Sequence, residues 1–126
     1  INPLTALLDI PNGALLERPA VWRVAEGVAC ETAAVARAQG ISLPFADPVA
    51  FVAEVCRQTA ANSSSMRQDL QRGRPTEIDA LNGAVVRVGR RLNVPTPLNE
   101  GLWRQVKAAE QRRLRAASPP TLHPIP

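Results

Sequence analysis

Apolar residues recur at intervals of three and four along most of this chain, the spacing that places side chains on one face of an α-helix. The clearest such stretch predicts a helix over residues 20–39. Pro19 stands where this helix would begin, because proline tolerates the first helical turn, and Gly40 can end it in the left-handed conformation. The stripe on one face consists of Val21, Val24, Ala25, Val28, Thr32, Val35 and Ala36.

Two more helices are predicted where a short polar residue precedes a proline. Asp47 and Pro48 fit the N-cap and first helical position of a helix over about 48–60. Thr96 and Pro97 fit the same two positions at the start of the last helix. One side of that helix carries Leu98, Leu102, Val106, Ala109 and Arg113.

Between these helices, two capping patterns predict a short third helix and a longer fourth one. Ser65 followed by Gln68 fits a capping box, and the glycine and proline at 73 and 75 would end that helix. Thr76 with Asp79 makes a similar cap for the fourth helix, which Asn93 can end in the left-handed region. Its apolar stripe is Ile78, Leu81, Val85, Val88 and Leu92.

These patterns predict an all-α fold of five or six helices. Strand signals are almost absent, because no stretch alternates apolar and polar residues between turn signals. The 126 residues fit one domain. We expect it to cover residues 1–117 and to be followed by a Pro-rich tail over 118–126. The chain opens with Ile1 directly in "INPLTALL", so we expect it to be a piece of a longer protein.

The excess of basic residues suggests nucleic-acid binding, but the distribution of these residues along the chain argues against it. The formal net charge is +4, and Lys107 is the only lysine among fifteen basic residues. The arginines are mostly scattered, and only four aromatic side chains exist, so a surface for stacking bases is not expected. No apolar run approaches the ~20 residues of a membrane span, so no membrane partner is expected either.

The sequence also argues against a metal centre. Cys30 and Cys56 stand far apart in helical patterns, and His123 lies in the Pro-rich tail. A zinc site needs three or four such ligands. We therefore predict no metal site and interpret the cysteines as buried structural thiols.

Polar residues gather at two predicted helix starts in the stretch "NSSSMRQDLQRGRPTEID", residues 62–79. Free N–H groups at a helix start attract anions, and the serines at 63–65 add hydroxyl donors. Glu77 follows Thr76 in the first predicted turn. Residue types alone favour simple capping and solvation here, and a small-ligand site is the alternative.

The order of the motifs adds a stronger indication. "INPLTALLDIPNG" is followed about fifty residues later by "NSSSMRQDLQRGRPTEIDALNGAVVRVGRRLNVPTPLNEGLWRQVKAAE". Over residues 1–110 the chain resembles the C-terminal domain of ketopantoate reductase. That resemblance implies a compact helical domain of the 6-phosphogluconate-dehydrogenase C-terminal-domain-like type. It also implies a cytoplasmic, NADPH-dependent parent enzyme of pantothenate biosynthesis.

In such a parent, an N-terminal Rossmann domain carries the cofactor loop, and a 2-oxo acid binds in the cleft between the two domains. This chain has no G-x-G-x-x-G motif, so the Rossmann domain is absent from it. We expect the chain alone to be inactive.

The resemblance assigns roles to four residues of this chain. Asn2 matches the last asparagine of a Lys-Asn-Asn motif, whose proton-donating lysine would lie eight positions before it. Asn12 and Ser65 match substrate-binding residues. Glu77 of "TEID" matches a catalytic glutamate beside the cofactor and the reacting centre.

Other functions remain open on these residues. A related reductase acting on another 2-oxo acid would carry the same motifs. A helical self-association module, forming a homodimer, is an alternative from a different class. Nucleic-acid binding ranks third.

Overall fold

The computed structural model describes residues 1–118, and every regular element within them is helical. The all-α prediction is therefore confirmed. Of the predicted tail over 118–126, only Ser118 belongs to the described residues. The elements are α1 (Asn2–Leu8), the 3-10 helix η1 (Asn12–Leu15), α2 (Pro19–Ala38), α3 (Pro48–Gln58), α4 (Ser65–Gln71), α5 (Asn82–Arg91) and α6 (Pro97–Ala117).

Local sequence signals place several helix ends as predicted. Asp47 Oδ1 accepts hydrogen bonds from the backbone N–H groups of Val49 and Ala50, at 2.9 and 3.1 Å, and so caps α3. Gly40 follows α2 with φ of 78°. Asn93 follows α5 with φ of 55°, a conformation that asparagine tolerates better than most residues.

Two predicted caps were wrong in detail. The cap of α4 is Ser64, whose Oγ accepts from the N–H of Arg67 at 3.1 Å, so Ser65 is the first helical residue. Thr96 precedes α6 but makes no side-chain cap bond. Glu31 of α2 caps α6 instead, since its carboxylate accepts from the N–H groups of the second and third helical residues, at 2.8 and 2.9 Å. A cap supplied by a residue 67 positions away leaves no local pattern.

The predicted start of the fourth helix at Thr76 was also wrong. Residues 76–81 are not helical but form a bend at Glu77 and a turn over 78–81, and α5 begins only at Asn82. The carbonyl of Glu77 accepts from the N–H of Leu81 as in a helix, but Leu81 itself leaves the helical region with φ and ψ both at −96°. This kink separates the turn that carries Glu77 from the helix that follows it.

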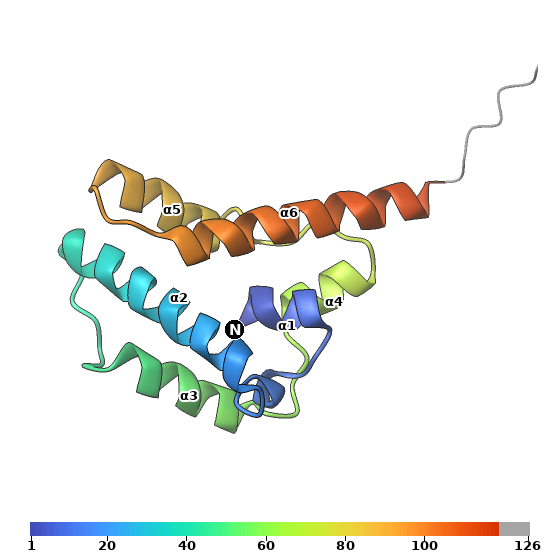
Figure 1. Cartoon of the computed structure of the whole chain (residues 1–126). Coiled ribbons are helices and arrows are strands. Elements are labelled where there is room, and N and C mark those ends of the chain that lie inside the picture. Colours follow the sequence, from blue (N-terminus) through green and yellow to red (C-terminus); the bar gives the residue numbers. More distant parts are fainter. Residues whose placement is uncertain (119–126) are drawn as a thin grey trace, which may run out of the picture.

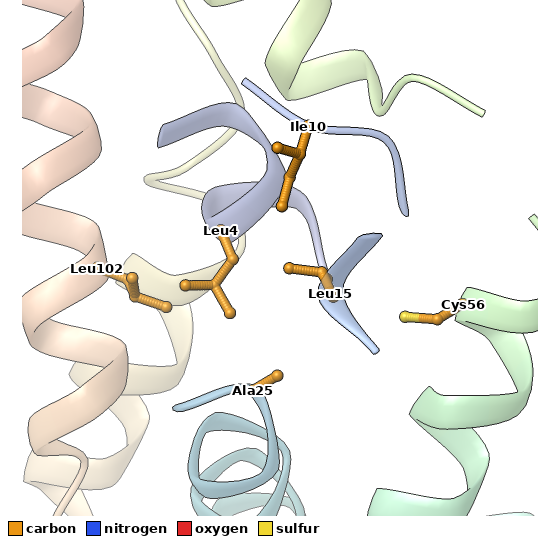
Figure 2. Packing of buried hydrophobic residues seen from close by; sticks show 6 residues of the cluster. All are labelled: Leu4, Ile10, Leu15, Ala25, Cys56 and Leu102. Carbon is orange, nitrogen blue, oxygen red and sulfur yellow. The ribbon is translucent and has the colours of Figure 1, made fainter. Parts of the chain in front are cut away.

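α1 lies at the centre of the molecule, where it contacts α4 and α6 (Figure 1). Neither α1 nor η1 was predicted as a helix, and the "PNG" turn expected at residues 11–13 leads into η1. Figure 2 shows side chains from α1, η1, α2, α3 and α6 converging on one core. A second core lies between α1, α4, the 76–81 turn and α6. The members of the first core are Leu4, Ile10, Leu15, Ala25, Cys56 and Leu102, and those of the second are Ala6, Met66, Leu70, Ile78 and Val106.

The two cysteines differ in their surroundings. Cys56 is fully buried, and this burial raises the pKa of its thiol, as expected for a structural cysteine. Cys30 is exposed, so the prediction that both thiols are buried was wrong for it. Within residues 1–118, no group of three or more potential ligands could hold a metal ion. No helix of this part of the chain is long and apolar enough to span a membrane.

Candidate functional site

A chain of buried hydroxyl groups joins the start of α1 to the start of α4. Thr5 Oγ1 lies 2.8 Å from Ser64 Oγ and can donate to the carbonyl of Ile1 or Asn2, at 3.2 and 3.1 Å. Ser64 Oγ already accepts from the N–H of Arg67. Since each hydroxyl has one proton, Ser64 donates to Thr5, and Thr5 donates to the α1 backbone. The first residues of the two helices, Asn2 and Ser65, are thereby held in one region.

Asn12 is joined to the segment that leads into α4. Its backbone N–H donates to the carbonyl of Asn62 at 3.1 Å, and its side-chain Nδ2 donates to Thr59 Oγ1 at 3.0 Å. Thr59 Oγ1 in turn donates to the carbonyl of Val55 at 2.7 Å. These bonds fix the orientation of the Asn12 amide. Its Oδ1 is buried and has no hydrogen-bond partner within residues 1–118, and such orphaned buried acceptors are rare in folded proteins.

Ser65 and Asn2 also keep their side-chain polar groups free. Ser65 is exposed, and its Oγ makes no hydrogen bond within residues 1–118, because its neighbour Ser64 supplies the cap. Asn2 is half-buried, and its side-chain amide likewise has no partner in the described part of the chain. The adjacent hydroxyls therefore hold the structure, while the residues singled out by their motif positions remain available.

Glu77 lies in the turn between α4 and α5, at the edge of the second core. It is exposed, and its carboxylate has no hydrogen-bond or ion-pair partner among residues 1–118. The next residue, Ile78, is fully buried against Met66, which follows Ser65 in α4. This packing places the Glu77 turn beside α4. These contacts connect α1 and η1 to the segment that leads into α4, and they place the Glu77 turn beside α4.

α6 holds this turn through charged side chains. Glu110 Oε1 accepts from the N–H and the hydroxyl of Thr76, at 2.8 and 2.6 Å. Lys107 Nζ lies 3.3 Å from Glu110 Oε2 and 3.0 Å from Asp79 Oδ2. Burial alone would raise the pKa of Glu110, but the bonds from Thr76 and the charge of Lys107 lower it overall. The hydrogen bonds from Trp103 and Lys107 lower the pKa of Asp79. Side chains of α6 therefore hold the chain at Thr76 and at Asp79, on both sides of Glu77.

A separate apolar groove of about 580 Å³ lies between the start of α1 and helices α2, α3 and α5. Asn2 lines it, but Asn12, Ser65 and Glu77 do not. Polar lining comes mainly from Asn2, Thr32, Asn82 and Asn99.

Sequence reasoning missed the supporting roles of Thr5, Thr59, Ser64 and Glu110, although it named Ser64 among the hydroxyl donors of the helix start. Their partners lie 59, 47, 59 and 34 positions away, so no local pattern marks them. One signal could have pointed to Thr5. It is a polar residue within the apolar stretch "PLTALL", and it is buried in the structure.

The family model described as ketopantoate reductase PanE/ApbA C terminal matches residues 1–110. The chain belongs to this family. A 2-dehydropantoate 2-reductase of Pyrobaculum aerophilum is 44% identical over 110 residues, which are 87% of this chain and 39% of that protein. The chain therefore spans about two-fifths of the length of the curated relatives it matches.

Solved structures with the same fold include two kinds of enzyme. A PanE/ApbA family ketopantoate reductase from Ralstonia eutropha superimposes with a TM-score of 0.83 at 38% identity, covering 89% of this chain and 37% of that one. D-Mandelate dehydrogenase with NADH and anilino(oxo)acetate superimposes with a TM-score of 0.81 at 30% identity, covering 89% and 47%. The chain thus shares its helical fold with part of each of these enzymes.

Proposed function

We propose that this chain is the substrate-binding C-terminal part of an NADPH-dependent 2-dehydropantoate 2-reductase, which reduces ketopantoate to pantoate. One observation carries the proposal. The four residues that match family positions all keep free polar groups, although their neighbours Thr5, Thr59, Ser64 and Thr76 are fully engaged. Among these free groups is the buried Oδ1 of Asn12.

The residue types suit a substrate that carries a carboxylate, a ketone and a hydroxyl. The Ser65 hydroxyl and the Asn2 amide can donate hydrogen bonds to oxyanions. The Asn12 Oδ1 is an acceptor whose burial makes a hydroxyl donor a favourable partner. Together these groups can hold the 2-oxo acid in one orientation, and orientation of reactants can contribute about 7–11 kcal/mol.

The cofactor would be held mainly by the N-terminal Rossmann domain of the parent. Bound NADPH supplies the hydride for the ketone carbon. The exposed, unpartnered carboxylate of Glu77 fits a contact with cofactor hydroxyls beside the reacting centre. The growing charge on the substrate oxygen needs a proton donor. We assign that role to the lysine expected eight positions before Asn2.

The full-length parent should oxidise NADPH when ketopantoate is added, and the chain of residues 1–126 alone should not. Loss of reduced-nicotinamide absorbance measures this reaction directly. The assay should include NADH and an aryl 2-oxo acid, because the D-mandelate dehydrogenase structure was described with NADH and anilino(oxo)acetate. A parent that prefers the aryl acid would redirect the substrate assignment. Turnover by the isolated chain would contradict the division of labour between domains.

Self-association of the isolated chain is a second candidate, favoured by the apolar groove. Phe51 of its lining is 47% exposed and Leu81 is 40% exposed, and burial of exposed apolar surface drives association. Sedimentation velocity over a range of concentrations should then show a dimer, and Phe51→Ser should weaken it. A strict monomer at high concentration would remove this candidate.

A further inference from the structure

Glu110 is a buried carboxylate that the proposed substrate contacts leave unused. It lies on α6, one helical turn beyond Val106 of the second core, and is only 8% exposed. Buried carboxylates are costly unless they are hydrogen-bonded or paired. The carboxylate of Glu110 is stabilised by hydrogen bonds from Thr76 and by an ion pair with Lys107.

The bonds of Glu110 end directly beside Glu77. Both donors of Thr76, its N–H and its hydroxyl, reach the same oxygen of Glu110. The Thr76 hydroxyl oxygen also accepts from the N–H of Ile78 at 3.3 Å. A continuous path of hydrogen bonds therefore runs from Ile78 through Thr76 to Glu110 and fixes the residues on both sides of Glu77.

The backbone of Glu77 is held as well. Its carbonyl accepts from the N–H groups of Ala80 and Leu81, both at 3.0 Å. Its carboxylate, in contrast, has no hydrogen-bond or ion-pair partner among residues 1–118. Because the backbone around Glu77 is hydrogen-bonded and its carboxylate is unused, the carboxylate is suited to contacting a ligand rather than to stabilising the turn.

We propose that Glu110 is a positioning residue for the proposed reaction, which acts by fixing the turn that presents Glu77 to the cofactor and substrate. This inference rests on the proposed reductase function. It assigns to Glu110 no contact with substrate, cofactor or the reacting atoms. Its effect on turnover must therefore pass through Glu77.

A double-mutant cycle in the full-length parent tests this dependence. Glu110→Gln should lower kcat/KM for ketopantoate roughly tenfold, because a displacement of about 1 Å at a reacting site can cost about a hundredfold. In a Glu77→Ala background, the same Glu110→Gln change should have almost no further effect, since coupled residues are not additive. Thr76→Val, which keeps the N–H donor and loses the hydroxyl, should show the same coupling in milder form.

Glu31→Gln is the matched control for stability. Like Glu110, Glu31 accepts backbone N–H groups, but its donors lie at the start of α6 and not in the turn that carries Glu77. The Glu31→Gln variant should lower the thermal midpoint of the parent, but it should leave kcat/KM for ketopantoate unchanged at a temperature where the variant is folded. If Glu110→Gln lowers kcat/KM by the same factor in the wild-type and Glu77→Ala backgrounds, the positioning role of Glu110 is wrong, while the proposed reductase function still stands. If the wild-type parent reduces no 2-oxo acid, both the positioning role and the proposed function are wrong.

Discussion

Ser65→Ala and Glu77→Ala in the full-length parent should each lower kcat/KM for the 2-oxo acid about tenfold or more, without lowering the thermal midpoint. Both side chains are exposed and make no hydrogen bond within residues 1–118, so their removal breaks nothing that holds the fold. A lost hydrogen bond to a charged group costs about 1.5–3 kcal/mol. A factor of ten corresponds to about 1.4 kcal/mol, so the expected loss is at least tenfold.

Ser64 provides an adjacent control with the opposite behaviour. Ser64→Ala removes the cap of α4 and the hydroxyl that bonds to the buried Thr5 Oγ1. It should lower the free energy of unfolding by about 1–3 kcal/mol. Urea denaturation and steady-state kinetics on the same three variants separate the two effects. If Ser65→Ala and Ser64→Ala lose stability equally and activity equally, Ser65 is merely part of the helix start.

Gly13→Ala should be the most damaging single methyl addition near the site. A Cβ at Gly13 would lie 2.6 Å from Cβ and 2.9 Å from Cα of Ala60, so backbone must move. The N–H of Gly13 also donates to the carbonyl of Ala60 at 3.0 Å. Overpacking of this kind costs about 1–3 kcal/mol. Because Asn12 is bonded to the same segment, the variant should also lower kcat/KM in the parent.

Gly101→Ala is the matched glycine control. Gly101 lies inside α6, and nothing lies within 4 Å of a Cβ placed there. Alanine is favoured over glycine in a helix by about 0.5–1 kcal/mol, so this variant should raise the unfolding free energy. Chemical denaturation of both variants measures the contrast. A Gly13→Ala protein as stable as wild type would show that η1 does not pack against Ala60 as described.

Sequence and structure contribute unequally to the definition of the site. The motif order alone points to Asn2, Asn12, Ser65 and Glu77, and to the family. It could not separate a ligand-binding serine from a capping serine within "SSS". The structure identifies the capping serine as Ser64, which also bonds Thr5, a residue 59 positions away.

The sequence by itself determined the helical class and most helix ends, because prolines, glycines and short polar caps act within one turn of the chain. Asp47 and Gly40 are examples. Only the tertiary structure decided where α5 begins, what caps α6, and which polar side chains stay free. Glu31 reaches from α2 to the start of α6, and Glu110 reaches from α6 to the turn before α5. The energy of such bonds depends on distance in space, which separation along the chain does not reveal.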